Sequence, residues 1–402
     1  MPEHNNTVGL VVAGAAARGA YEAGALSVLI PELARQDKRP TVMVGSSAGG
    51  INAFLLAQYS HLEAQEAVEK VVAVWSQIEL SSVIKLSLPT ALGTGVGYLA
   101  ESLGIPGVRL KSLFDTAPLR ATVKQNFDAD RLHRNIQEGR VCALALAATA
   151  ANRRTTMFVE ATADVPLPPP DEARAIDYVA ARIEPAHVLA SAAIPVLFPP
   201  VFVERSDKFR GWYRDGLVRL NAPIKPALTL GAERLALVAS DPVTYSTSAT
   251  PDQDVKTEPD MGDAGSQLLQ AVLADRMIED IHRLRKVNRL VEDNPSLAIR
   301  KDGGDRYQSI QHIFAGPSEP GRLGQAADDF LAKNSQWGLM APVMTAFMLL
   351  GILLGRNSMS RGELLSWLLF DPDFMKELIK IGKADAHRRL AEAQQAGAFP
   401  FD

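Results

Sequence analysis

Two short apolar segments, each followed at once by a turn of very small residues and then by a helical pattern, constrain this chain most. VGLVVA at 8–13 precedes GAAARG, and TVMVG at 41–45 precedes SSAGG. Short runs rich in β-branched residues are typical of buried strands. Strands that alternate with helices form a parallel sheet covered on both faces. We therefore predict an α/β protein with three layers, α/β/α, a largely parallel central sheet, and further helices in the C-terminal part.

Similar strand-like runs occur along most of the chain, at 140–150, 155–160, 209–215, 234–240 and 309–315. Because the last run belongs to the same pattern, we predict an α/β domain over residues 7–320. A helical extension packed on this domain is expected over residues 321–402. Three irregular segments interrupt the predicted domain: an apolar insert rich in Gly and Pro at 86–108, a proline-rich loop at 162–173, and a polar loop at 240–263.

Composition argues against several kinds of partner. In 402 residues, 42 basic and 46 acidic side chains leave a net charge of −4, which does not favour nucleic acid. The single cysteine, Cys142, excludes an intramolecular disulfide and a cysteine-based metal cluster. Seven histidines are scattered with no two at ligand spacing. We therefore predict neither a metal ion nor a cofactor.

The N-terminal sequence MPEHNNTVGL lacks the basic and apolar regions of a secretory signal, which favours a cytoplasmic location. An uncharged stretch at 337–355 approaches the roughly 20 apolar residues that a membrane-spanning helix needs. The same stretch is compatible with a buried or membrane-facing helix, and we favour that interpretation over a span.

The second small-residue turn, GSSAG at 45–49, has the form GxSxG and stands between a predicted strand and a predicted helix. This context is typical of a nucleophile elbow, in which a strained serine exposes its Oγ above the sheet. Ser47 is then a candidate nucleophile, and the Ala48 N–H at the helix start is available to an oxyanion. The alternative is a tight turn that closes a βα unit and has no catalytic role.

The first small-residue turn, AGAAARGA at 13–20, is not a nucleotide-binding loop. Gly14 and Gly19 have the Walker spacing, but the following Lys and Ser or Thr are missing, and GxGxxG is absent. The exposed N–H groups and the cation of Arg18 are what an anion or oxyanion site requires. The alternative is a tight turn whose arginine points into water.

Asp215 precedes Gly216 at the end of an aromatic strand-like run. A carboxylate placed against a serine hydroxyl and shielded from water has a raised pKa and can act directly as the base. Asp215 could instead orient a third residue of a triad, with candidates His282, His312 and His387. We favour the direct base, since no histidine lies in either small-residue turn or beside Asp215.

Five segments in order resemble the patatin-like phospholipase family: GLVVAGAAARGAYEAGAL, VGSSAGGINA, SLFDTAPL, ASAAIPVLFPP and the DG pair at 215–216. Residues 273–290 and 364–386 also resemble the later part of bacterial members. The resemblance implies hydrolysis of phospholipids, lysophospholipids or other acyl esters through an acyl-enzyme. It assigns Ser47 as the nucleophile and Asp215 as the general base of a Ser-Asp dyad. The implied oxyanion hole comprises Gly14, Ala15, Ala16, Ala17, Arg18, Gly19 and Ala48.

The sequence departs from the family pattern at Ala15 and Ala16, where glycine is usual, and at Leu217, where Gly or Ala is usual. Alanine keeps its N–H but resists positive φ, so an oxyanion donor that needs this conformation would be weakened. A weak or inactive lipid-binding module therefore stays open as an alternative. An acyltransferase that uses the same dyad is a further alternative, because the sequence does not separate it from a hydrolase.

The resemblance also bears on three further features. The insert at 86–108 is a candidate lid or wall of the acyl pocket. Arg18 either braces its loop or meets a phosphate. The expected partners are an acyl-ester substrate and peripheral contact with a membrane; the oligomeric state does not follow from the sequence.

Overall fold

The computed structural model describes residues 7–85, 112, 114–152, 154–205, 207–220, 223–242, 275–294, 308–334 and 361–401. The predicted insert at 86–108, most of the predicted loop at 240–263 and the apolar stretch at 337–355 lie outside these residues. None of the described helices has both the length and the apolar character needed to cross a membrane.

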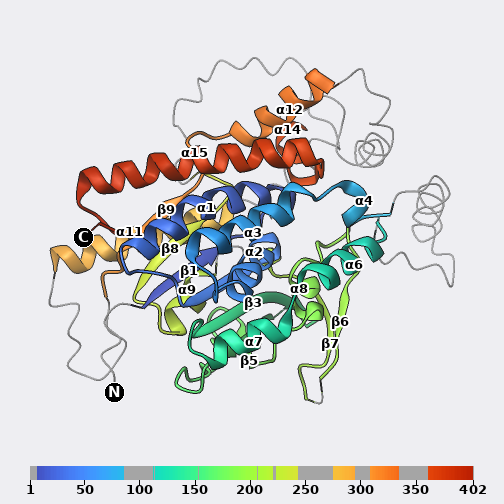
Figure 1. Ribbon diagram of the computed structural model, residues 1–402. Helices are drawn as coiled ribbons and strands as arrows, with labels where there is room; N and C mark the ends of the chain where they lie inside the picture. The colour runs from blue at the N-terminus through green and yellow to red at the C-terminus, as the bar shows by residue number, and fades with distance from the viewer. Residues whose placement is uncertain are drawn as a thin grey trace, which may run out of the picture.

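The described strands form one twisted, mixed sheet at the centre of the molecule (Figure 1). They are β1 (Val8–Val12), β2 (Val42–Ser46), β3 (Ala143–Ala150), β4 (Thr155–Ala161), β5 (Ile176–Ala180), β6 (Val201–Val203), β7 (Gly211–Asp215), β8 (Arg234–Val238) and β9 (His312–Ala315). The main order is β5-β4-β3-β2-β1-β8-β9, with β7 paired to β3 and β6 paired to β7. Neighbours from β3 through β9 in this order run parallel, as do β4 and β5, whereas β3 is antiparallel to β4 and β7, and β6 to β7.

Helices cover both faces of this sheet. They are η1 (Ala16–Arg18), α1 (Gly19–Arg35), α2 (Ser47–Gln58), α3 (Ala64–Ser76), α4 (Leu80–Val83), α6 (Ala117–Asn126), α7 (Ala129–Gln137), α8 (Pro185–Ser191), η2 (Gly216–Val218), α9 (Ile224–Thr229), α11 (Asp275–Asp293), α12 (Arg322–Asn334), α14 (Arg361–Leu368) and α15 (Pro372–Ala396). On β1, Leu10 and Val12 belong to the core beneath α1 and α2, whereas Val11 belongs to the core beneath α9 and α11. Since adjacent side chains of a strand point to opposite faces, the predicted three-layer α/β/α fold is confirmed.

The helix α15 lies along α1 on the outside of one helical layer (Figure 1). Their backbones approach so closely that a Cβ on Gly24 would lie 2.2 Å from the Ile379 carbonyl oxygen, and one on Gly382 would lie 2.0 Å from that of Tyr21. The Tyr21 hydroxyl also donates to Asp385 at 3.1 Å. The C-terminal helices are therefore packed tightly on the α/β layers.

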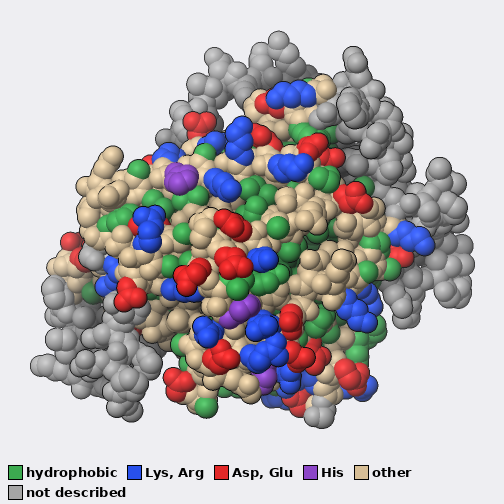
Figure 2. Space-filling view, in the orientation of Figure 1, with side chains coloured by type: hydrophobic (Ala, Val, Ile, Leu, Met, Phe, Trp, Pro, Cys, Tyr) green, Lys and Arg blue, Asp and Glu red, His purple; other side chains and the backbone are tan. Residues whose placement is uncertain are grey.

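The strand predictions differ from the structure mainly at short or antiparallel elements. The runs starting near residues 140 and 209 form strands that begin later, as β3 and β7, and β7 and β4 are antiparallel to β3. The strands β5 and β6 were not predicted: β5 (IDYVA) is interrupted by the charged Asp177, and β6 is only three residues long. On the face in Figure 2, acidic and basic side chains are interspersed, as the near-balanced charge leads one to expect.

Candidate active site

Ser47 occupies a sharp turn between β2 and α2, where its φ of 53° is in the left-handed region. The two glycines of GSSAG allow this turn to pack tightly. A Cβ on Gly45 would lie 2.4 Å from the Gly49 carbonyl oxygen, and one on Gly49 would lie 2.2 Å from that of Ala13. Left-handed backbone is costly for a residue with a side chain, so the surrounding packing holds Ser47 in the strained conformation predicted for an elbow.

The register of β3 brings Ser47 and Asp215 together. β2 pairs with β3 up to Ser46, opposite Ala147, and β7 pairs with the next residues, so that Asp215 lies opposite Ala148. The other edge of β3 is occupied by β4. Because β2 is parallel and β7 antiparallel to β3, their carboxyl ends meet head to head. Across this junction the Ser47 hydroxyl donates a hydrogen bond of 2.6 Å to Asp215 Oδ2.

Asp215 is completely buried and held from several sides. Its backbone N–H donates to the Ala193 carbonyl at 2.9 Å, and its carbonyl accepts from Thr149 Oγ1 at 2.9 Å. Its Oδ1 accepts from the Leu217 N–H at 2.9 Å. Gly216 is required here because a Cβ would lie 2.4 Å from the Ala147 carbonyl oxygen. The DG pair therefore fixes the carboxylate against Ser47.

Burial raises the pKa of Asp215 from 3.8 to about 7, although the hydrogen bonds from Ser47 and Leu217 oppose the shift. Loss of water disfavours a buried carboxylate, whereas donors favour it. A group with a pKa close to neutral exchanges protons readily at ordinary pH, which suits a general base. The raised pKa expected from the sequence is thus present in the structure.

Ser191, at the end of α8, supports the elbow and was not singled out from the sequence. Its Oγ accepts a hydrogen bond of 3.0 Å from the Ser47 N–H and is fully buried. The only signal was its place in the segment ASAAIPVLFPP. Asn52 on α2 was also missed, although it is a lone amide in the apolar run INAFLLA. Its side-chain amide donates to the Gly19 carbonyl and to Glu22, both at 3.0 Å, and its oxygen accepts from Trp75 at 2.6 Å.

The loop after β1 lies beside the elbow, and it contains a second strained residue. Ala16 has a φ of 45°, whereas Ala15 has a φ of −145°. The chain therefore adopts positive φ at one of the two alanines that replace glycine. The Arg18 N–H donates to the Ala15 carbonyl at 2.9 Å, and the Gly19 N–H donates to carbonyls of the same loop. Ala48, the second residue of α2, has an N–H with no acceptor inside its own helix.

The Arg18 side chain points to the C-terminal helices. It is 1% exposed, and its Nε donates to Ser366 Oγ at 2.8 Å. One Nη donates to the carbonyl of Glu363 and to its carboxylate, and the other pairs with Asp241 at 3.4 Å. Of the two roles considered for Arg18, these contacts favour bracing the loop over binding a phosphate.

An apolar cavity opens at Ser47. Its lining residues are Ala16, Ser47, Ala48, Ile51, Val74, Trp75, Ile78, Val83, Leu119, Thr122, Val123, Asn126, Phe127, Ala192, Ile194, Phe198 and Phe370. Hydrophobic walls with a few polar groups at one point are typical of sites for apolar ligands. Ser47 therefore lies in the wall of a cavity whose lining is almost entirely apolar.

A model of a known family decides the identity of the fold. The model described as patatin-like phospholipase matches residues 10–228, more than half of the 402 residues. The chain belongs to the patatin-like phospholipase family. The matched region contains both small-residue turns and Asp215, and it ends before α11.

Solved structures similar to this patatin-like chain are distant from it. VipD from Legionella pneumophila is 13% identical with a TM-score of 0.36, and human GIVD cytosolic phospholipase A2 is 10% identical with a TM-score of 0.42. The matches cover 96% and 97% of this chain, and 67% and 60% of the other two. The complex of SpcU and ExoU from Pseudomonas aeruginosa is 16% identical with a TM-score of 0.27, covering 98% of this chain and 80% of that one. Comparison with curated protein sequences gives no match.

The histidines considered for a triad lie on elements other than those that hold Ser47 and Asp215. His312 is on β9, which is separated from β2 by β1 and β8. His282 is on α11 and His387 on α15. Since Ser47 Oγ and Asp215 Oδ2 are in direct hydrogen bond, the geometry favours the dyad over the triad.

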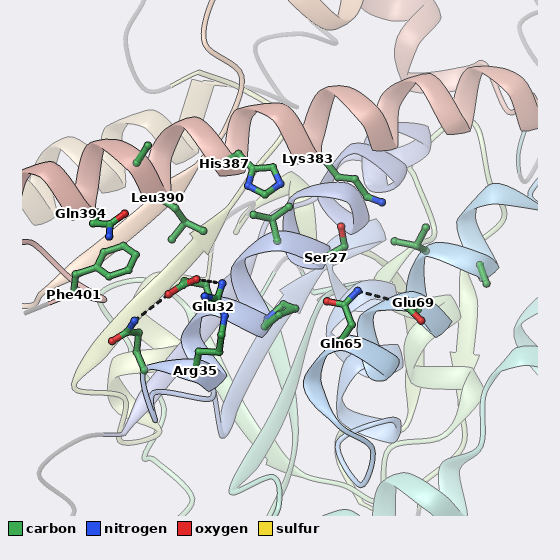
Figure 3. A pocket seen from close by; sticks show the side chains of 16 residues that line it. Ser27, Glu32, Arg35, Gln65, Glu69, Lys383, His387, Leu390, Gln394 and Phe401 are labelled. Atoms are coloured by element: carbon green, nitrogen blue, oxygen red, sulfur yellow. Dashed lines mark hydrogen bonds and ion pairs between the residues drawn. The ribbon is translucent and has the colours of Figure 1, made fainter.

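A larger groove of about 790 Å³ lies between α1, α3 and α15, and Figure 3 shows its lining. Its charged groups are already satisfied in part, because Glu32 pairs with Arg35 and accepts from Gln36 at 3.0 Å. Glu69 accepts from Gln65 at 2.8 Å. The groove shares no lining residue with the cavity at Ser47, so its larger size does not make it the candidate active site. Within the described ranges, no group of three or more His, Cys, Asp or Glu residues is placed to hold a metal ion.

Proposed function

We propose that this protein is a lipid acyl hydrolase that cleaves carboxylic esters with Ser47 as nucleophile and Asp215 as general base. The observation that carries the proposal is the 2.6 Å hydrogen bond between Ser47 Oγ and the buried Asp215 carboxylate. The apolar cavity at Ser47 suits an acyl chain. Membership of the patatin-like phospholipase family supports lipid hydrolysis.

In the first step, Asp215 takes the hydroxyl proton while Ser47 Oγ bonds to the ester carbonyl carbon. The carbonyl oxygen becomes negative and is stabilised by backbone N–H groups of the loop at 14–17 and of Ala48. The intermediate then collapses to an acyl-enzyme, and the alcohol leaves with the proton from Asp215. In the second step, water gives a proton to Asp215 and attacks the acyl carbon, and the fatty acid is released as Ser47 regains its proton.

The decisive experiment compares the wild-type protein with Ser47→Ala on p-nitrophenyl acyl esters. We expect Ser47→Ala to lower kcat by at least about 10⁴-fold, since a serine nucleophile has no substitute. A fluorophosphonate probe should label the wild type and not the variant. If the wild type neither labels nor releases p-nitrophenol, the protein is no hydrolase, and a lipid-binding role remains.

Histidine variants test the dyad against the triad. His282, His312 and His387 are replaced by Gln one at a time. Each replacement should change kcat by less than about threefold, because Asp215 Oδ2 accepts its hydrogen bond directly from Ser47. A loss of several orders of magnitude in one of them would instead support a triad. A panel of phospholipid, lysophospholipid and neutral ester, each with Ser47→Ala as the blank, identifies the substrate class.

A further inference from the structure

We infer that residues 361–370, which form α14 and the turn after it, complete the active site. They hold the oxyanion loop in place through Arg18, and they contribute a wall of the apolar cavity through Phe370. Residues 361–370 lie outside residues 10–228, the region that matches the family model. The inference rests on the proposed function, because it assigns positioning and specificity roles for that same reaction.

The contacts of Arg18 carry the first half of the inference. Nε donates to Ser366 Oγ at 2.8 Å, and Nη2 donates to the Glu363 carbonyl at 3.1 Å as well as to its carboxylate. The guanidinium also lies over the ring of Trp367, 5.1 Å from its centre. Ser366 is in turn tied to its own helix, because its hydroxyl donates to the Glu363 carbonyl at 2.6 Å. One turn of α14 thus encloses the guanidinium.

The oxyanion loop has few other side chains with which to hold its shape. Between Ala13 and Ala20 every residue except Arg18 is Ala or Gly. Ala16 is strained at a φ of 45°, and a strained residue keeps its conformation only where its surroundings enforce it. The Arg18 N–H donates to the Ala15 carbonyl, so the anchored arginine is bonded directly across the strained residue. Through its contacts with Arg18, α14 therefore fixes the direction in which the loop N–H groups point.

Phe370 carries the second half. It follows α14 by two residues and lines the cavity together with Ala16 and Ser47. Because the Phe370 N–H donates to the Leu368 carbonyl at 3.0 Å, its position follows the end of α14. A shift of α14 would therefore move the loop donors and the cavity wall together. Ser366 and Glu363 are positioning residues that act through Arg18, and Phe370 is a specificity residue for the acyl chain.

The test of the brace is Ser366→Ala, with Ser27→Ala as its matched control. Both serines donate to the carbonyl three residues earlier in their helix, at 2.6 and 2.7 Å, but only Ser366 also accepts from Arg18. We expect Ser366→Ala to lower kcat by about 10–100-fold with KM changed less than about threefold, since misplaced donors act on the transition state. Ser27→Ala should retain wild-type kcat and KM.

A second readout needs no activity. Hydrogen exchange of the backbone N–H groups at 14–18 should be at least about tenfold faster in Ser366→Ala than in Ser27→Ala, because the loop loses an anchor. Unchanged exchange in this segment overturns the brace whether or not the protein is a hydrolase. If exchange rises in Ser366→Ala while the wild type shows no esterase activity, the brace stands and the proposed function fails.

Phe370→Ala tests the cavity wall. On p-nitrophenyl esters of long chains KM should rise by about tenfold, because apolar contact with the chain is lost, whereas the acetyl ester should keep its kinetics. Leu290→Ala, at an exposed apolar side chain on α11 that does not line the cavity, is the control and should change neither. An equal change of KM for acetyl and long-chain esters would rule out a specificity role for Phe370.

Discussion

The two small-residue turns that follow the adjacent strands β1 and β2 are both strained, but different contacts hold them in place. Each holds a residue other than glycine at positive φ, Ala16 at 45° and Ser47 at 53°. The turn around Ser47 is held from within the α/β layers, by close backbone packing at Gly49 and by hydrogen bonds to Ser191 and Asp215. The turn around Ala16 is held by Arg18, whose partners on α14 are 345 and 348 residues away in the sequence.

This difference separates two parts of the proposed chemistry. Ser47 and Asp215, the proposed nucleophile and base, are positioned by strand register and by glycine packing, which cannot change without disrupting the sheet. The loop donors depend on a helix that is attached through side chains. A displaced helix can therefore weaken oxyanion stabilisation while the Ser47–Asp215 pair stays intact. Substitutions in one turn should accordingly have effects that differ from those in the other.

The largest effect after loss of the nucleophile is expected from Asp215→Asn. The amide keeps the shape of the side chain but cannot take up the Ser47 proton, so kcat should fall by about 10²–10⁴-fold. Steady-state kinetics on a p-nitrophenyl ester measure this loss. Asp207→Asn, at a half-exposed aspartate near the β6–β7 turn, is the matched control and should retain full activity. Activity within tenfold of wild type in Asp215→Asn would assign the base elsewhere.

The second effect is the pH dependence that Asp215 imposes. Its pKa is raised to about 7, and only the ionised form accepts a proton, so kcat should fall about tenfold per pH unit below 7 and level off above it. Stability changes in the opposite sense. The folded pKa exceeds the unfolded value of 3.8, so stability contributed by the neutral carboxyl is lost as pH rises from about 4 to 7.

Both slopes can be measured against Asp215→Asn. The residual rate of that variant should not fall below pH 7. Between about pH 4 and 7 the free energy of unfolding of the wild type should decrease relative to that of the variant. A rate profile with the same acidic limb in both proteins would mean that another group controls it.

The turn around Ser47 and the DG pair could largely be predicted from the sequence, because the residues that determine them are local. GSSAG, the strand before it and the DG pair fall within short segments whose residue types are dictated by backbone geometry. That Ser47 and Asp215 meet could be inferred only from the chemistry and the resemblance, since the register of β2 and β7 on β3 is a property of the folded sheet. The unpredicted strand β6 extends the sheet beyond β7 by three residues, too few to show alternation.

The contacts that hold the turn around Ala16 could not be predicted from the sequence. Nothing near Arg18 in the sequence indicates Glu363 or Ser366, because buried polar contacts between distant segments follow no periodicity. The sequence likewise does not show which of Ala15 and Ala16 adopts positive φ. The structure assigns the positive φ to Ala16 alone, with Ala15 at negative φ.

Gly49→Ala breaks the packing between the two turns. The new Cβ would lie 2.2 Å from the Ala13 carbonyl oxygen and 2.3 Å from that of Val12, and backbone cannot move aside cheaply. We expect a loss of about 3 kcal/mol in the free energy of unfolding, measured with urea. Gly211→Ala is the control, because a Cβ there meets nothing within 4 Å, and its stability should change by less than about 1 kcal/mol. Equal effects at the two glycines would refute the packing argument.

The smallest expected effect concerns the strain at Ala16, and it tests whether Arg18 holds that strain. Ala16→Gly removes a cost of about 1–2 kcal/mol at positive φ but adds backbone freedom to the unfolded chain, so net stability should change by less than about 1 kcal/mol. The informative quantity is the coupling with Ser366→Ala. In the wild-type loop, a loosened Arg18 lets Ala16 relax toward negative φ, whereas a glycine at this position has no such preference.

Ser366→Ala should therefore lower kcat by about fivefold less in the Ala16→Gly background than in the wild type, a coupling of about 1 kcal/mol in a double-mutant cycle. An additive cycle would mean that Arg18 does not hold the strain at Ala16, and that the loop, like the elbow, keeps its conformation through its own packing.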